Sequence, residues 1–532
     1  MESNMPHNAD YIIIGGGTAG LVVASRLSED PKVQVLVLES GPDRTADLRV
    51  QNPGAWSTLI GSELDWEMKI APQIGLNNRG QDHPAGKMLG GSSALNGLAW
   101  VPPSPAGIDA WAKLGNPSWN WESLLPYLQK SCTVTHRDQS STGNGPIQVI
   151  YPALQELASK PLIEAWIQAF DDQGYTHTDD IFGGPVTVGS RGYAATIDPV
   201  SGSRSSADSQ YRISNRGNMN IVTEATVRKI DFSSESQDGS LVATGVEIEL
   251  NGQTLNIPAK KEVILAAGAF QTPKLLELSG VGKSDHLNPF GIPVMLDHSG
   301  VGENLQNHLM SILPVPLKAE GLTPGIKTLA FTCLDRDELQ QILSKSPRPN
   351  TSDRVIESIL ESPKEASACL FLSVKPGQVA LLGVISSFPF SRGSTHISSS
   401  DYNARPTIDP QFLANDIDIE VLAHHVQKLH SLANSPALKP FLEPSAVPRD
   451  LEEIKELLRN ATALTTHHTC STASMLPQEA GGVVSEELRV YGTKNVRVVD
   501  ASVFPLIPHA NPMATVYAVA ERAAEVIRAS QH

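Results

Sequence analysis

The sequence predicts a mixed α/β fold in which a discontinuous, mostly parallel α/β domain encloses an inserted domain built on an antiparallel sheet. Two observations lead to this prediction. Near the start of the chain, the β-branched run at 11–14 leads into a glycine-rich turn and then into helical periodicity, as in a buried parallel strand with its crossover helix. Near the end, a strand and a long helix return after a middle stretch of short β-like runs. We therefore expect three parts, at 8–308, 309–460 and 461–532.

The elements follow from apolar runs and helical spacing along the chain. The expected elements are a strand at 11–14, a helix at 21–27, a strand at 33–38, a strand at 263–267 with a helix after Gly268, β-like runs at 379–385 and 393–397, helices at 416–432 and 450–458, a strand at 496–499 and a helix at 512–529. The β-like runs between about 310 and 415 distinguish the inserted domain from the two flanking parts.

Composition and charge exclude several classes of partner. Of the 532 residues, 40% are apolar and 18% are charged, and the formal net charge is −16. A nucleic-acid groove or an anionic membrane surface needs clustered Lys and Arg, so we expect neither as a partner. No apolar run approaches the roughly 18 residues that span a bilayer. The polar start of the chain and four cysteines without pairing or metal spacing favour a reducing, cytoplasmic location.

The first turn carries a dinucleotide-binding pattern of the Rossmann type. The sequence Gly-Gly-Gly-Thr-Ala-Gly at 15–20 stands between the first strand and the first helix, and an acidic residue closes the next strand. The first glycine permits the tight turn, the second lets backbone approach a pyrophosphate, and the third permits close packing of helix on strand. The carboxylate would accept hydrogen bonds from ribose hydroxyls. The expected contacts are Gly15, Gly17, Thr18, Ala19, Gly20 and Glu39. The competing interpretation is a glycine-rich loop without a ligand.

Three further segments decide which dinucleotide is expected. They are Gly-Lys-Met-Leu-Gly-Gly-Ser-Ser-Ala-Leu-Asn at 86–96, the stretch 268–282 that opens Gly-Ala-Phe-Gln-Thr-Pro, and the tail from Asp500 through Asn511 to Ala524. In this order they resemble the two signatures and the C-terminal flavin-contacting segment of the glucose-methanol-choline (GMC) oxidoreductases. The stretch 304–308 and the triplet 391–393 are weaker echoes of that family. The resemblance extends from residue 10 to residue 527.

The resemblance implies FAD as the cofactor, with hydride removal from a carbinol carbon to flavin N5. It implies an FAD-binding domain at 8–308 that includes part of the substrate cap, a substrate-binding domain at 309–460, and a return to the FAD-binding domain at 461–532. The 90–96 loop would lie against the isoalloxazine ring and Asp500 near the ribityl-pyrophosphate. The further cofactor contacts that it implies are Gly90, Gly91, Ser92, Asn96, Gly97, Val227, Asp500, Ala501, Asn511, Pro512 and Met513. It implies no metal.

The family also places a histidine and a second polar residue at the reacting carbon. Its register selects His468 over the neighbouring His467, and counting back from the last helix selects Asn511. The histidine would take the hydroxyl proton, since its unperturbed pKa lies near neutrality, and the asparagine would hold the substrate oxygen. Ser471 stands where the family usually has glycine, so the loop is less free to adopt an unusual φ. Stiffening of the loop at 101–104 by two prolines predicts an altered pocket entrance.

Structural interpretations of the same residues, without a catalytic role, stay open. Asn511 followed by Pro512 is also a typical helix start, with Asn as the N-cap and Pro in the first helical position. His468 taken alone could be a hydrogen-bonded loop histidine. His467 and His509 could line the pocket or simply lie beside the pair.

Two functional classes follow from the resemblance. The first is an FAD-dependent oxidase or dehydrogenase that acts on a small alcohol and passes electrons to oxygen or another acceptor, as in intracellular fungal specialised metabolism. The second is a non-redox cyclase or lyase on the same fold, in which FAD is mainly structural. A flavoprotein without catalysis is a third, weaker option, against which the intact histidine and asparagine argue.

Overall fold

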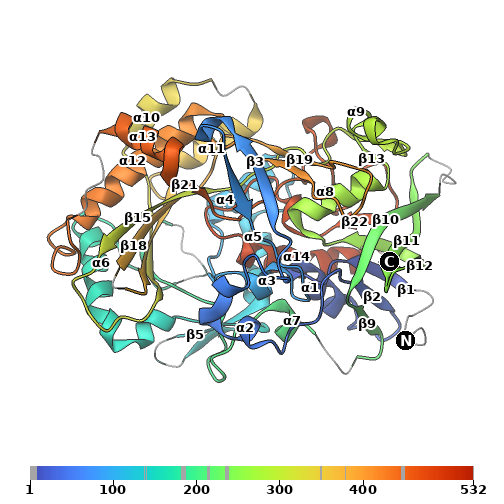
Figure 1. The fold of residues 1–532 in the computed structure, drawn as a ribbon, viewed down its shortest axis with the longest axis horizontal. Coiled ribbons are helices and arrows are strands. Elements are labelled where there is room, and N and C mark those ends of the chain that lie inside the picture. Colours follow the sequence, from blue (N-terminus) through green and yellow to red (C-terminus); the bar gives the residue numbers. More distant parts are fainter. Residues whose placement is uncertain are drawn as a thin grey trace.

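The computed structural model describes residues 9–136, 138, 140–180, 182, 187–212, 216–233, 239–347, 350–377, 379–444 and 450–530. Figure 1 shows a large sheet at each side of the molecule, with helices between and around them. One large sheet is mostly parallel and the other is antiparallel. The mixed α/β architecture is therefore the one that the sequence predicts.

The first large sheet has seven strands and is built from both ends of the chain. Its order is β10 (Ala225–Ser233), β11 (Val242–Leu250), β12 (Gln253–Leu265), β1 (Ala9–Ile14), β2 (Val35–Leu38) and β9 (Met219–Val222), with β22 (Val496–Val498) beside β12. The pairs among β9, β2, β1, β12 and β22 are parallel, whereas β10 and β11 add an antiparallel hairpin. Because β22 returns to this sheet from the C-terminal part of the chain, the predicted discontinuous Rossmann-like domain is confirmed.

The turn between β1 and α1 (Thr18–Leu27) accepts only glycine at two positions. Gly15 has φ +103°, and a Cβ there would lie 2.5 Å from the carbonyl oxygen of Ala266, directly after β12. A Cβ on Gly20 would lie 2.0 Å from the carbonyl oxygen of Gly15. Side chains at either position would push α1 off the sheet, so the outer glycines of the motif serve helix–strand packing.

The second large sheet has six strands, all antiparallel. Its order is β21 (Ala463–Thr465), β15 (Leu309–Pro316), β18 (Val379–Ser386), β17 (Ala368–Lys375), β16 (Gly325–Thr332) and β8 (Gly189–Gly192). The long helix α12 (Asp416–Ala433) packs against β17 and β18. The sheet thus takes β8 and β21 from outside the stretch 309–460, and those domain boundaries stay a prediction.

Alternation along β17 gives this sheet two different faces. Leu370 and Leu372 belong to the same apolar cluster as Leu422 of α12, whereas Cys369 and Phe371 point to the opposite side. Successive side chains of a strand point to opposite faces, so one face is covered by α12 and the other is free to line a cavity.

Three smaller sheets and a set of shorter helices complete the structure. The small-sheet strands are β19 (Ser394–His396), β20 (Thr407–Asp409), β3 (Met68–Gln73) and β4 (Arg79–His83) in one sheet, β6 (Ser141–Gly143), β5 (Cys132–Thr135) and β7 (Ile147–Ile150) in the next, and β13 (Val281–Gly282) with β14 (Leu296–Asp297) in the last. The helices are α2 (Leu48–Gln51), α3 (Ser92–Leu95), α4 (Pro105–Lys113), α5 (Trp121–Ser131), α6 (Lys160–Asp171), α7 (Ala207–Gln210), α8 (Gly268–Leu278), α9 (Ser284–Leu287), α10 (Arg336–Ser344), α11 (Thr351–Leu360), α13 (Leu451–Leu457) and α14 (Met513–Ala529). The stretch expected to be β-rich therefore also holds α10 and α11.

The last helix is anchored by a buried carboxylate. Glu521 of α14 is fully buried and accepts hydrogen bonds from Arg26 of α1, with Nη2–Oε1 at 2.7 Å, and from the hydroxyl of Tyr211 at 2.9 Å. Lys130 of α5 lies 3.1 Å from its other oxygen. A buried charge is stable only when it is paired and hydrogen-bonded, so these contacts hold α14 against α1 and α5.

Two further expectations concern cysteines and membranes. All four cysteines are free. Within the described ranges, none of the helices combines the length and apolar character that crossing a bilayer requires.

Candidate active site

One large cavity lies between the two sheets. Its volume is about 1190 Å³, and it is lined by Ile14 and Leu38 of the seven-stranded sheet and by Met310, Leu329 and Cys369 of the six-stranded sheet. Pockets for small organic ligands commonly occupy about 300–1,000 Å³. The cavity is therefore large enough for a dinucleotide together with a small second molecule.

The dinucleotide motif forms one end of this cavity. Gly17, Thr18 and Ala19 line it at the start of α1, and no side chain caps the N–H groups of this helix end. Free N–H groups at the positive end of a helix form an anion site, which suits a pyrophosphate. The residues present thus fit the phosphate portion of FAD.

Glu39 lines the same end of the cavity, directly after β2. Its carboxylate is buried and accepts hydrogen bonds from the backbone N–H groups of Gly16 at 2.8 Å and Gly41 at 2.7 Å. Burial raises the pKa of Glu39 to about 7, and these two backbone donors act against that rise. Each oxygen keeps a second lone pair, and Glu39 lines the cavity, so the carboxylate can accept hydrogen bonds from a ribose diol.

The loop before α3 is pressed against the dinucleotide motif. The N–H of Gly90 donates to the carbonyl of Gly16 at 2.8 Å, and a Cβ on Gly91 would lie 2.8 Å from the Cα of Gly17. Gly91 has φ +52°, which favours glycine. The backbones of two segments more than seventy residues apart therefore meet without side chains between them.

The structure brings nearly all of the predicted site residues to this cavity. Those that line it are Gly15, Gly17, Thr18, Ala19, Glu39, Gly91, Ser92, Asn96, Gly97, Val227, His468, Asp500, Ala501, Asn511, Pro512 and Met513. Gly20 and Gly90 do not line it, since Gly20 packs against Gly15 and Gly90 is bonded to the motif backbone.

Asp500 connects the C-terminal segment to α8. Its Oδ2 accepts hydrogen bonds from the N–H of Gly268 at 2.9 Å and from the hydroxyl of Thr272 at 2.6 Å. Burial raises the pKa of this carboxyl group, and the donors around it oppose that effect. Asp500 thus ties the C-terminal segment to the N-terminus of α8, and Gly268 of α8 and Met513 of α14 both line the cavity.

Asn511 does not cap the helix that follows it. Helix α14 begins at Met513 with Pro512 as its N-cap, and no side chain bonds to its first N–H groups. The side chain of Asn511 turns instead to His468, with 3.0 Å between Nδ2 and His468 Nε2. Of the two interpretations of Asn511, capping is thus wrong in this structure, and the predicted pair is brought together at the cavity.

His468 is buried among other imidazoles. Its exposed fraction is 8%, and burial, followed by the neighbouring His308, His467 and His83, lowers its pKa well below the ordinary 6.5. The ring is therefore neutral at neutral pH. One of its two nitrogens carries a proton and the other a lone pair.

A chain of hydrogen bonds decides which nitrogen holds the proton. His308 Nε2 lies 2.8 Å from the carbonyl oxygen of Ser387, which can only accept. Burial lowers the pKa of His308 to about 4, so this ring is neutral and its Nδ1 bears a lone pair. His468 Nδ1 lies 3.0 Å from His308 Nδ1 and must donate to it. The lone pair of His468 is consequently on Nε2, beside the amide of Asn511.

The loop that carries His468 is held by the side chain of Asn307 and is locally strained. Asn307 accepts a hydrogen bond from the N–H of His468 at 3.0 Å and donates to the hydroxyl of Thr465 at 2.9 Å. His467 and Ser471 have φ of +63° and +74°, although neither is glycine. Left-handed conformations cost such residues roughly 1–2 kcal/mol each. The loop therefore adopts the unusual φ at Ser471 despite lacking the glycine.

Sequence reasoning missed the two residues that position His468. His308 and Asn307 lie in the weak 304–308 echo, about 160 residues before their partner, and no spacing pattern links the two segments. His467 lines the cavity, whereas His509 does not, and its Nδ1 accepts a hydrogen bond from the N–H of Ser104 at 2.9 Å. The predicted effect of 101–104 on the entrance is wrong, because these residues are buried and none lines the cavity.

The wall that faces the pair from the six-stranded sheet is largely apolar. It is formed by Met310, Leu329, Cys369, Phe371 and Ile385. The charged side chains on that side include Lys327 and Glu156, which neutralise each other at 2.6 Å. The arrangement favours a second molecule with an apolar body.

Comparison with known proteins covers almost the whole chain. Two family models described as GMC oxidoreductase match residues 9–310 and 389–520. The glucose oxidase-like protein fsoC of Humicola fuscoatra is 34% identical, over 98% of this chain and 96% of that protein. An FAD-dependent oxidoreductase from Chaetomium thermophilum has a TM-score of 0.88 and 29% identity, covering 98% of this chain and 100% of that one. A fungal aryl-alcohol oxidase has a TM-score of 0.85 and 27% identity, covering 99% and 100%.

These matches confirm the predicted fold and the predicted cofactor. The family models together with the relatives leave no large part of the chain outside the comparison. The motif residues at the cavity also fit a dinucleotide on physical grounds. The chain therefore belongs to the GMC oxidoreductase family and is an FAD-dependent oxidoreductase.

Proposed function

We propose that this enzyme oxidises the CH–OH group of a small alcohol with a largely apolar body to the corresponding carbonyl compound. The observation that carries the proposal is the pair of polar atoms, His468 Nε2 and Asn511 Nδ2, 3.0 Å apart on the wall of the cavity that the dinucleotide motif also lines. A lone pair and an amide donor at this separation match the proton and the oxygen of one hydroxyl group.

The chain's own residues perform the acid–base part of this reaction. When FAD is bound, its isoalloxazine supplies the acceptor for the hydride that leaves the carbinol carbon. His468 Nε2 takes the hydroxyl proton, and Asn511 Nδ2 donates a hydrogen bond to the oxygen as the C–O bond gains double-bond character. Nδ1 of His468 keeps its proton toward His308 throughout. Oxygen or another acceptor then takes the electrons.

The substrate class follows from the opposite wall. Met310, Phe371 and Ile385 offer an apolar surface, and the nearby Lys327 is already paired with Glu156. A sugar would leave many hydroxyl groups without partners against this surface, at a free-energy cost for each. We therefore propose aryl or aliphatic alcohols in preference to polyhydroxylated ones.

Anaerobic reduction of the bound flavin tests the proposal. The holoenzyme is mixed with aryl, aliphatic and sugar alcohols in turn. We expect the aryl and aliphatic alcohols to bleach the flavin. We expect His468→Ala to lower the rate of bleaching by about 10²- to 10⁴-fold while FAD stays bound, since general-base catalysis contributes on that order. His467→Asn is the matched control, with a much smaller loss expected because its ring makes no hydrogen bond to Asn511.

Two results would contradict the proposal. Near-normal bleaching in the His468→Ala variant would remove this histidine from the role of base. Conversion of a substrate without any bleaching would favour the non-redox cyclase or lyase instead. Flavin absorbance, measured in every variant, separates loss of chemistry from loss of FAD.

A further inference from the structure

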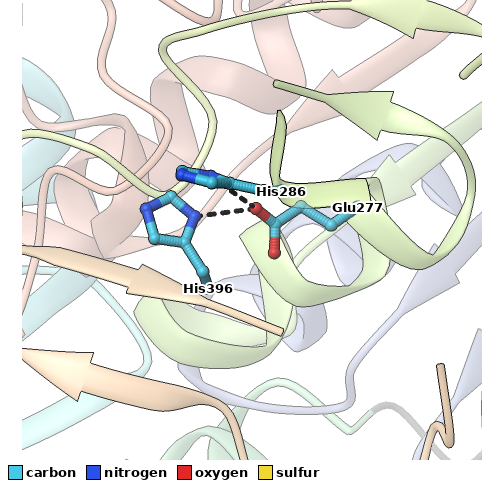
Figure 2. A group of neighbouring side chains, drawn as sticks. All are labelled: Glu277, His286 and His396. Carbon is cyan, nitrogen blue, oxygen red and sulfur yellow. Dashed lines mark hydrogen bonds and ion pairs between the residues drawn. The ribbon is translucent and has the colours of Figure 1, made fainter. Parts of the chain in front are cut away.

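We propose that Glu277, His286 and His396 form a binding site for a divalent transition-metal ion of the zinc type. Figure 2 shows the two imidazole rings facing the carboxylate of Glu277. One ligand atom from each residue lies within 4.8 Å of the other two. Glu277 is on α8, His286 on α9 and His396 on β19, so the three come from separate elements.

The distances suit the coordination geometry of zinc. With bonds of about 2.0–2.1 Å, two ligands of a tetrahedral zinc ion are roughly 3.4 Å apart. The two separations from Glu277 Oε1 lie on either side of this value, at 2.7 Å to His396 Nδ1 and 4.0 Å to His286 Nδ1. Rotations that move these atoms by under about 1 Å would place all three at coordination distance.

The hydrogen bonds around the cluster leave the metal-binding atoms of Glu277 and His396 available for an ion. Glu277 Oε2 is occupied by the N–H of Ile397 at 2.7 Å, which leaves Oε1 for the ion. His396 Nε2 lies 3.3 Å from Glu303, and a carboxylate on the far nitrogen orients a metal-binding imidazole. Two histidines and one carboxylate are a common protein ligand set for zinc.

A simple ion pair accounts for only part of the cluster. A protonated His396 between Glu277 and Glu303 would satisfy those three groups. It would leave His286 Nδ1, a buried atom without a hydrogen-bond partner among the described residues, pointed at Glu277 from 4.0 Å. A metal ion uses that lone pair, and this is the observation that favours a site over a pair.

The site is separate from the proposed chemistry. Neither the three proposed ligands nor Glu303 lines the large cavity, although residues at both ends of α8, from Gly268 to Leu278, do. The ion would hold α9 and β19 against the C-terminal end of α8, as structural zinc does in other folds. Zinc binding at this site is therefore independent of the role of His468.

Zinc binding to the untagged holoenzyme tests this inference. After treatment with a chelator and its removal, Zn²⁺ is titrated by calorimetry, and bound zinc is counted by elemental analysis after gel filtration. We expect one ion per chain, and an anomalous difference peak at the zinc edge between the three side chains in crystals. His286→Ala and Glu277→Gln should each weaken zinc affinity at least tenfold, with FAD content unchanged.

Further variants separate this site from zinc binding elsewhere on the protein. His424→Asn replaces a half-buried imidazole on α12 outside the cluster and should bind zinc as the wild type does. Glu303→Gln should weaken binding by about tenfold or more through the orientation of His396. Stoichiometric binding that is unchanged in the His286→Ala and His396→Ala variants would place the ion elsewhere. Absence of stoichiometric binding would leave an ion pair only.

Discussion

A neutral imidazole can act as a base only if its proton sits on the nitrogen that faces away from the substrate. In this enzyme that condition is met by three residues in series. The carbonyl of Ser387 fixes the proton of His308, and His308 in turn fixes the proton of His468. Burial keeps both rings neutral, because it lowers the pKa of each below 6.5. His308 is thus a positioning residue in the proposed reaction.

Substituting His308 should reveal this dependence. His308→Leu removes the acceptor for His468 Nδ1, so the proton can move to Nε2 and occupy the lone pair that the substrate needs. We expect the rate of anaerobic flavin reduction to fall at least about tenfold, since a wrong histidine tautomer is strongly inhibitory in other enzymes. His308→Asn keeps an acceptor near the position of Nδ1 and should recover much of the rate. Equal losses in the two variants would show that His308 only fills space.

At the level of elements, the cavity depends on places where two backbones touch. The helix start at Gly17 and the loop at Gly91 come from different elements, and Gly17 Cα lies too close to Gly91 for a side chain on Gly91. Such contacts explain why local patterns are informative here. A glycine is required where φ is positive or where backbone approaches backbone, and that requirement is visible in the sequence.

Gly91→Ala should release FAD. The new Cβ would lie 2.8 Å from Gly17 Cα at a φ of +52°, so the loop must move away from the start of α1. We expect the ratio of flavin to protein absorbance after gel filtration to fall several-fold. Gly174→Ala is the matched control, since it also has a positive φ, +82°, but nothing within 4 Å of the added Cβ. Full flavin content in Gly91→Ala would contradict this account of the loop.

Sequence patterns identify some helices and strands of this chain and miss others. The expected strand at 33–38 is β2 (Val35–Leu38), the expected helix at 416–432 is α12 (Asp416–Ala433), and the expected helix at 512–529 is α14 (Met513–Ala529). Long apolar or periodic segments are recognisable because each buries a continuous face. By contrast, β8 (Gly189–Gly192) is glycine-rich and polar, and only its pairing with β16 makes it a strand.

Over the whole molecule, folding buries several imidazoles and so ties stability to pH. His425 lies under the six-stranded sheet, where it contacts the hydroxyl groups of Thr332 and Ser367. Burial lowers its pKa to about 3. Below pH 6.5 the unfolded chain binds a proton at this ring while the folded chain does not. The stability contributed by the neutral ring is therefore present above 6.5 and is lost as pH falls toward 3.

His425→Gln should reduce this loss. At pH 5.5 the wild-type ring destabilises the fold by about 1.4 kcal/mol relative to neutral pH, and the variant lacks that contribution. The measurement is the change in free energy of unfolding by urea between pH 7.5 and pH 5.5, compared between the variant and the wild type. His424→Gln, on the same helix, controls for the substitution itself. An identical pH dependence in wild type and His425→Gln would show that the buried ring becomes protonated without unfolding.

Local sequence patterns predicted the fold class and the dinucleotide motif, whereas FAD and the pair His468 and Asn511 were predicted from the family resemblance. The fold class and the dinucleotide motif are predictable because they depend on local requirements, namely glycines at positive φ and apolar runs in buried strands. The folded structure was needed to place the proton on His468, to show the side-chain direction of Asn511 and to reveal the group of Glu277, His286 and His396. Each of these arises from contacts between segments far apart in the chain, and the spacing within one segment carries no information about them.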